Sequence, residues 1–211
     1  MNFDWLDRNV DTVLGYLGEH VQITFAALGL GILIAFPVGL AAFRFKRAYG
    51  PILAVTQILY TVPSLALFVL LINVVGLGKT AVIIGLTIYS LVILVRNLVE
   101  GLRGVAPEVS QAATAMGYRQ TPRMLTVELP LAVPAIVAGL RVAAVSNISL
   151  VSVGALIGTG GLGQLFIHGF QVDNPIEIWT GIVVTVALAL TVDLLIVAGG
   201  RALTPWARGT R

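Results

Sequence analysis

Residues 21–43 read VQITFAALGLGILIAFPVGLAAF and contain no Asp, Glu, Lys or Arg. A helix needs about 20 predominantly apolar residues to cross a bilayer, so this stretch can span one. The whole chain has the same character, with 57% hydrophobic and 11% charged residues among 211. Soluble domains carry about 25% charged residues. So few polar side chains could not cover a water-soluble fold, and we expect an all-α transmembrane protein.

The rest of the chain divides into similar apolar segments separated by charge, Gly or Pro. About five spanning helices are expected, at Val21–Phe43, Tyr49–Val75, Thr80–Val95, Ala132–Val153 and Ile178–Gly199. The 23 glycines suit close helix packing within a membrane.

The N-terminal stretch, residues 1–20, differs from these spans. Its apolar residues recur at spacings of three and four, and acidic residues occupy the other face. This pattern is typical of an amphipathic helix lying in the membrane interface. The alternative is a helix packed against the bundle. We therefore divide the chain into an interfacial helix at 1–20 and a transmembrane domain at 21–211.

Lys and Arg indicate how the chain is oriented, because they collect on the cytoplasmic side of membrane proteins. With five spans, ten basic residues fall on one side: Arg44, Lys46, Arg47, Arg96, Arg103, Arg119, Arg123, Arg201, Arg208 and Arg211. We therefore expect a multi-pass protein of the cytoplasmic membrane, with its N-terminus outside and its C-terminus in the cytoplasm.

One long loop, residues 98–131, lies on the expected cytoplasmic side. A short helix is predicted to begin near Pro107 and Glu108, both suited to a first helical turn. Gly117 is placed to end it in the left-handed conformation. A second short helix should begin at Thr121-Pro122 and close at Leu129-Pro130. The result is an elbow with Arg119 and Arg123 at its corner.

The same loop resembles the EAA loop of ABC importer permeases. That pattern is Glu-Ala-Ala, three residues, Gly, nine residues, Ile, one residue, Leu-Pro. This chain has Gln111, Ala112, Ala113, Gly117, Val127, Leu129 and Pro130 at the corresponding positions. It departs from the pattern in two places, with Gln111 for Glu and Val127 for Ile. Gln111 lacks the negative charge of the Glu in the pattern, which could pair with a basic residue on the partner subunit that this resemblance implies.

The resemblance implies a type I ABC importer permease-like fold and a set of partners. The loop would be the coupling helix, seated on a separate ATP-binding cassette ATPase that binds ATP and Mg²⁺. A second permease copy or homologue would complete the pore within membrane lipid, and an extracytoplasmic substrate-binding protein would deliver the solute. No cofactor bound by this chain and no nucleic-acid partner are expected. An elbow that merely covers the end of the bundle is the structural alternative.

A glycine-rich segment, Ile157–Gln164, follows the fourth span. With the five-span size, it resembles permeases of osmoprotectant importers, which move glycine betaine, carnitine, choline or proline. Methionine and other amino-acid importers have a similar segment. We expect an outer gate at Gly158, Gly160, Gly161 and Gly163, with a plain turn as the alternative.

Aromatic and polar residues within the spans are candidates for the translocation path. A quaternary ammonium is recognised by aromatic faces, which Tyr60, Tyr89 and Phe68 could supply. The path candidates are Tyr60, Ser64, Ser146, Asn147 and Ser149. Interhelical hydrogen bonding is the alternative for each polar residue.

Two charges lie inside spans. Arg141 and Asp193 are about 12–14 Å from the expected cytoplasmic edge, counted at 1.5 Å per residue. Charges at such depth usually face the bundle interior and pair with one another. We predict an Arg141–Asp193 ion pair, with separate partners for each as the alternative.

The sequence shows no enzyme-like constellation. It has no Cys, and His20 and His168 are far apart in sequence, so we expect no metal site and no catalytic residues. The rival function is a secondary transporter, which usually shows paired repeats and intramembrane acids. Here Asp193 is the one candidate acid.

Overall fold

The computed structural model of the chain describes residues 4–208, and every regular element in this range is helical. Expectations for residues 1–3 and 209–211, including Arg211, lie outside it. The elements are α1 (Asp4–Arg44), α2 (Lys46–Thr61), α3 (Ser64–Val75), α4 (Lys79–Arg103), α5 (Pro107–Ala115), α6 (Gln120–Arg123), a π-helical turn (Met124–Glu128), α7 (Leu129–Val151), a 3₁₀ turn (Ser152–Ile157), α8 (Gly163–Gln171), α9 (Pro175–Leu203) and a final 3₁₀ turn (Pro205–Arg208). The all-α fold class is confirmed.

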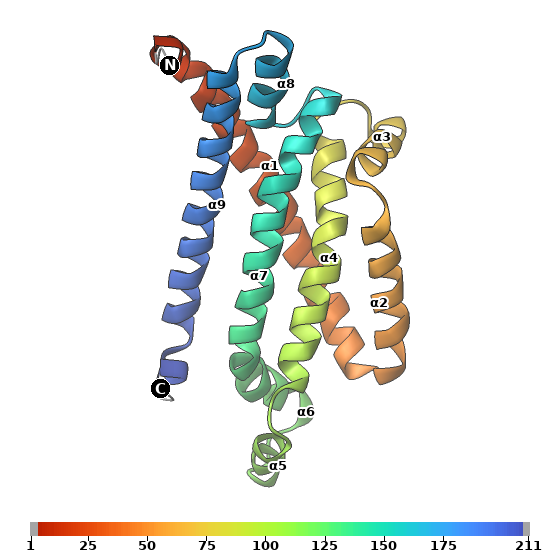
Figure 1. Cartoon of the computed structure of the whole chain (residues 1–211). Helices are drawn as coiled ribbons and strands as arrows, with labels where there is room; N and C mark the ends of the chain where they lie inside the picture. Colours follow the sequence, from red (N-terminus) through yellow and green to blue (C-terminus); the bar gives the residue numbers. More distant parts are fainter. Residues whose placement is uncertain (1–3, 209–211) are drawn as a thin grey trace.

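The long helices form a bundle with two distinct ends (Figure 1). Helix α4 packs against α1 and α7, and α9 packs against α7. We call the end that carries α5, α6 and the C-terminus of α9 the elbow end. The N-terminus, α3 and α8 lie at the opposite end (Figure 1). The two termini are therefore on opposite sides of the bundle, as an odd number of crossings requires.

Four helical stretches are long and apolar enough to cross a membrane, and a bent pair makes up to five. The bent pair corrects the expected second span, Tyr49–Val75, which is not one straight helix. Its two halves, Arg47–Thr61 and Ser64–Val75, meet at 97°. Pro63 is the cause, because proline has no backbone N–H and pushes the residue before it out of the helical region. Val62 accordingly has ψ of 129°.

The N-terminal helix also differs from expectation. No helix boundary lies at residue 20, since α1 runs from Asp4 to Arg44 and its kink is at Asn9. Val13 is buried in one apolar cluster with Leu162 and Leu165, and His20 is fully buried. The first half of α1 therefore packs against the bundle, which is the alternative that the sequence left open.

Small residues allow the central helices to approach closely. A Cβ added to Gly139 of α7 would lie 2.5 Å from Cβ of Asn97, on α4. A Cβ added to Gly101 of α4 would lie 2.9 Å from that of Ala135, on α7. Such contacts replace the hydrophobic driving force, which is absent between helices in lipid. Helix α9 contrasts with this core, since most of its large apolar side chains are exposed on the surface of the bundle.

The break between α2 and α3 generates a testable prediction. The Tyr89 hydroxyl donates a hydrogen bond to the Val62 carbonyl at 2.6 Å, which satisfies a carbonyl at the break. Tyr89→Phe should lower the free energy of unfolding in detergent by about 1 kcal/mol. Tyr60→Phe is the matched control, because the Tyr60 ring meets Tyr89 edge to face at 5.5 Å while its hydroxyl has no hydrogen bond within residues 4–208. Equal losses in both variants would contradict the role of the hydroxyl.

Candidate functional site

Helix α5 has the start and the end that its sequence predicts. Pro107 occupies the first turn and Glu108 lies beside it, where a carboxylate complements the helix dipole. At the other end Gly117 has φ of 87°, in the left-handed region. The Gly117 N–H donates to the Thr114 carbonyl, and the Tyr118 N–H donates to the Ala113 carbonyl. These two bonds form a Schellman cap, which turns the chain sharply.

A polar network fixes α5 against the next helical segment. Arg123 Nη1 donates to Thr114 Oγ1 at 2.7 Å, and Ser110 Oγ donates to Glu128 Oε1 at 2.9 Å. Arg123 Nε lies 2.9 Å from the same Glu128 oxygen, which forms an ion pair. The Glu128 side chain is only 6% exposed. These contacts of Arg123 and the buried Glu128 side chain tie α5 to the segment that leads into α7.

The second helix of the elbow does not close where we expected. Helix α6 begins at Gln120, after Arg119 at its N-cap, and passes through the π-helical turn directly into α7. Pro130 lies in the first turn of α7 and does not end a helix. A π-helical turn uses i→i+5 bonds, as Leu129 N–H to Met124 O shows. The i→i+5 bonds of this turn accommodate Pro130, which has no N–H to donate to a carbonyl of the preceding turn. Gln120–Ile157 is therefore one continuous helical stretch of 38 residues.

Helix α5 and its C-cap carry apolar residues at helical spacing, which we call the apolar stripe: Val109, Ala112, Ala113 and Met116. Only one of these four is buried. Ala113 is 1% exposed, whereas Val109 is 37% and Met116 is 71% exposed. Gln111 and Ala112 are also exposed. Leu129, by contrast, packs against the Leu98, Leu102 and Ala132 cluster. The elbow therefore presents an apolar surface outward, which suits contact with another protein.

Arg141 and Asp193 lie together, as the sequence predicts. Arg141 Nε and Nη2 donate to the two Asp193 carboxylate oxygens at 2.7 and 2.8 Å. This fork geometry is the strong form of an Arg–carboxylate pair. The pair joins α7 to α9 and lines a groove of about 580 Å³ together with Ser146.

The path candidates do not converge in the single chain. Asn147 is 1% exposed, and it exchanges hydrogen bonds with Ser90 at 3.0 and 3.2 Å. It joins α7 to α4 and matches the hydrogen-bonding alternative. Ser149 is exposed on α7.

Two other path candidates share a second, smaller cavity. Tyr60 and Ser64 line about 190 Å³ beside the α2–α3 break, with Tyr89. Phe68, a further aromatic candidate, is fully buried in the core. The structure thus places Tyr60 with Ser64, and Ser146 elsewhere.

The glycine-rich segment forms a buried turn against α1. Added Cβ atoms at Gly160 and Gly163 would overlap the Ala155 and Ser152 backbone, and one at Gly161 would lie 2.6 Å from His20 Cβ. Gly158 ends the preceding 3₁₀ turn in the left-handed conformation. This packing favours a fixed turn over a gate that opens within one chain.

His20 holds this turn in place through both ring nitrogens. Nδ1 accepts the Leu162 N–H at 3.3 Å, and Nε2 lies 2.8 Å from the Ile148 carbonyl. Because Nδ1 is an acceptor, Nε2 carries the proton and donates it. Sequence reasoning missed His20, together with Ser110, Thr114 and Glu128. Arg123 and Glu128 are five residues apart, a spacing that pairs in a π-helical turn and not in an α-helix.

Within residues 4–208, no group of three or more His, Asp or Glu side chains is arranged to hold a metal ion. The polar sites of the bundle are instead pairs that join helices. Such pairs hold neighbouring helices together.

The sequence matches known transport proteins over most of its length. A family model, "Binding-protein-dependent transport system inner membrane component", matches residues 27–209. The choline transport system permease protein of Bacillus subtilis (strain 168) is 34% identical over 95% of this chain and 93% of its own length. The osmoprotectant import permease protein of Salmonella typhimurium is 33% identical over 90% of this chain and 93% of its own length.

Solved structures share the fold. The chain is similar to one from inward-facing conformations of a methionine ABC transporter, with a TM-score of 0.83 and 24% identity, covering 97% of this chain and 100% of that one. A chain of an amino acid ABC transporter matches with a TM-score of 0.74 and 18% identity, covering 97% and 98%. The fold is thus that of type I ABC importer permeases, and the chain belongs to the inner membrane components of binding-protein-dependent transport systems, the permease subunits of ABC importers.

Proposed function

We propose that this permease subunit moves a small osmoprotectant, such as a quaternary amine, across the cytoplasmic membrane. The observation that carries the proposal is the identity of 33–34% with permeases named for choline, glycine betaine, carnitine and osmoprotectant transport, over 90–95% of the chain. The methionine transporter, at 24% identity, supports the fold alone. Tyr60 and Tyr89 agree with the proposal, because aromatic rings attract quaternary ammonium groups.

The elbow is our proposed coupling helix, seated on a separate ATPase subunit that handles ATP and Mg²⁺. Its exposed stripe, Val109 and Met116 beside Gln111 and Ala112, would form the contact. The Schellman cap at Gly117 and the Arg123–Glu128 pair would keep the elbow stiff. A displacement of α5 would then reach α7 through the continuous helix.

The basic residues support a cytoplasmic position for the elbow end. Arg44, Arg47, Arg103, Arg119, Arg123 and Arg201 all lie at or near the ends of elements at this side of the bundle. The positive-inside rule then puts the C-terminus in the cytoplasm and the N-terminus outside.

A second permease copy or homologue would complete the path. The groove that Ser146, Arg141 and Asp193 line between α7 and α9 is open in the single chain. Helix α9 exposes large apolar side chains beside it, including Val186, Leu190 and Leu194. A partner chain would cover these residues, and a substrate-binding protein outside would deliver the solute.

A solute panel tests the proposed substrate class. The importer, purified with its ATPase and binding protein, should hydrolyse ATP faster with choline, glycine betaine or carnitine than without solute. Methionine should leave the rate at its basal level. Stimulation by methionine and by none of the amines would contradict the proposal.

The cap at Gly117 tests the elbow as the coupling element. Gly117→Val should strain the left-handed position by about 1–2 kcal/mol and tilt α5 away from its seat. We expect less ATPase to copurify with this variant and uptake to fall. Gly117→Asn is the control, because Asn tolerates this conformation. Normal docking and uptake in Gly117→Val would refute the role of the elbow.

A charge swap tests whether transport depends on the ion pair that joins α7 to α9. Arg141→Asp and Asp193→Arg should each reduce uptake, because each places two like charges side by side between these helices. The double variant restores opposite charges at the two positions and should recover uptake. Expression in the membrane, measured for all three, separates transport from folding. Lack of recovery in a well-expressed double variant would count against the pair.

A further inference from the structure

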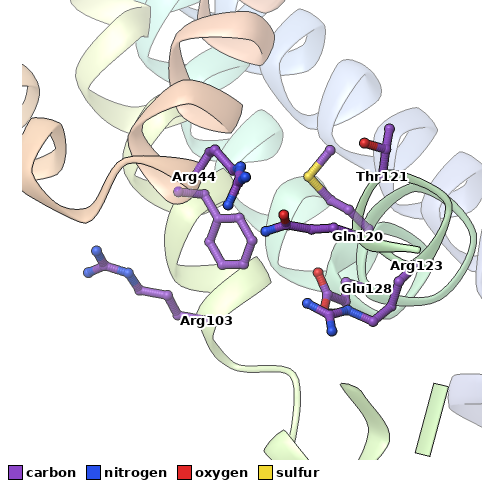
Figure 2. Close-up of a pocket in the computed structure, with 8 residues that line it drawn as sticks. Arg44, Arg103, Gln120, Thr121, Arg123 and Glu128 are labelled. Atoms are coloured by element: carbon purple, nitrogen blue, oxygen red, sulfur yellow. The ribbon is translucent and has the colours of Figure 1, made fainter. Parts of the chain in front are cut away.

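A basic pocket lies at the elbow end, apart from the exposed stripe of α5. It has a volume of about 270 Å³, and its polar lining is Arg44, Arg103, Gln120, Thr121, Arg123 and Glu128. These residues come from the last turn of α1, the last turn of α4 and the elbow. Figure 2 shows Arg44, Gln120, Arg123 and Glu128 near one another, with the Arg103 guanidinium extending away from them. The pocket therefore joins three elements that are far apart in sequence.

The charges in this pocket do not balance. Arg44, Arg103 and Arg123 line the pocket with one carboxylate, that of Glu128, which is already paired with Arg123. Arg103 lies over the Tyr49 ring, with its Cζ 3.8 Å from the ring centroid. Arg44 has no hydrogen bond or ion pair within the described part of the chain. The pocket thus keeps one positive charge, that of Arg44, without a carboxylate partner in the described part of the chain.

Neutral donors extend this positive site. Figure 2 shows the Arg44 guanidinium and the Gln120 amide extending toward one another, with the Arg123–Glu128 pair on the other side of Gln120. The Thr121 hydroxyl lines the same pocket. Guanidinium groups bind phosphate oxygens through two parallel hydrogen bonds, and amides and hydroxyls can add single bonds.

We propose that this pocket binds a phosphate group, with Arg44 and Gln120 as its principal ligands. The phosphate could belong to the headgroup of an anionic phospholipid or to free phosphate, since both offer the same oxygens. Its position at the ends of α1 and α4 is where apolar helices leave the hydrocarbon region. Basic pockets between transmembrane helices at that level bind anionic headgroups.

A bound phosphate would connect α1 to the elbow. The anion would be attracted to Arg44 on one side and to the elbow residues Gln120 and Arg123 on the other. It would also offset the repulsion between the guanidinium groups that share the pocket. Any effect on transport rests on the proposed function, whereas phosphate binding itself does not.

The test uses the purified full-length chain in an uncharged detergent at constant ionic strength. Its thermal unfolding midpoint is titrated with phosphatidylglycerol, phosphatidylcholine and inorganic phosphate, and sodium chloride serves as the salt control. We expect phosphatidylglycerol or inorganic phosphate to raise the midpoint more than phosphatidylcholine and chloride do. Arg44→Gln should weaken the apparent affinity for the effective probe roughly tenfold.

Arg47→Gln is the matched control, because Arg47 is an exposed basic residue of α2 near Arg44 that does not line the pocket. It should retain the wild-type affinity. A response to phosphatidylglycerol alone identifies a lipid headgroup, and a response to inorganic phosphate shows that the free anion suffices. Gln120→Ala provides a second pocket variant if Arg44→Gln does not fold.

Two results would overturn the site. In one, neither phosphate probe stabilises the wild-type chain more than chloride does. In the other, Arg44→Gln and Arg47→Gln lose affinity equally, which would indicate diffuse attraction to basic residues. Neither readout involves the ATPase or a solute, so failure here is distinct from failure of the proposed transport function.

Discussion

The structure depends on the π-helical turn that fuses the elbow to α7. Met124–Glu128 carries the helix past Pro130, where an ordinary α-helix would lose a hydrogen bond. The same turn places Glu128 beside Arg123, and their pair reaches back to Ser110 and Thr114 of α5. The helical stretch Gln120–Ile157 is 38 residues long, or roughly 57 Å at the α-helical rise. If α5 is the coupling helix proposed above, this continuous helix would carry its movement to α7.

The second constraint is the bilayer, which offers no water to polar groups. Polar groups along the helices pair with one another: Asn147 with Ser90 and Tyr89 with the Val62 carbonyl within the bundle, and Arg141 with Asp193 at the open groove between α7 and α9. Each pair joins two different elements. The polar pairs thus join specific elements, while glycines such as Gly139 set how closely the helices pack. The groove between α7 and α9 is open in the single chain, and under the proposed function a second chain would cover it.

Much of this fold could be predicted from periodicity and spacing. The apolar segments located the spans, Gly117 marked the end of α5, and the matching depths of Arg141 and Asp193 indicated their pairing.

Other features depend on three-dimensional context. Pro63 lies in a continuous apolar run, and only the resulting 97° bend shows that it breaks the helix. The amphipathic pattern of residues 1–20 fits a membrane surface and a bundle surface alike, and burial of Val13 and His20 decides between them. Pro130 reads as a helix end unless a π-helical turn is foreseen, and that turn has no sequence signature as clear as the Schellman glycine. Asn147 resembles a pore residue in sequence, but Ser90 on another helix occupies its amide. Apart from the Arg141–Asp193 pair, the sequence predicts elements and misses the partners of their polar groups.

Arg123 connects the elbow network with the basic pocket, since it pairs with Glu128 and lines the pocket with Arg44. Its charge is largely satisfied by Glu128, whereas that of Arg44 is not. Repulsion between like charges is weakened but not removed by such pairing, because the carboxylate lies closer to one guanidinium than to the other. The like charges of Arg44 and Arg123 therefore oppose close approach of the end of α1 to the elbow. The proposed phosphate would offset this repulsion, and if it belongs to a lipid headgroup it would connect the membrane surface to the elbow.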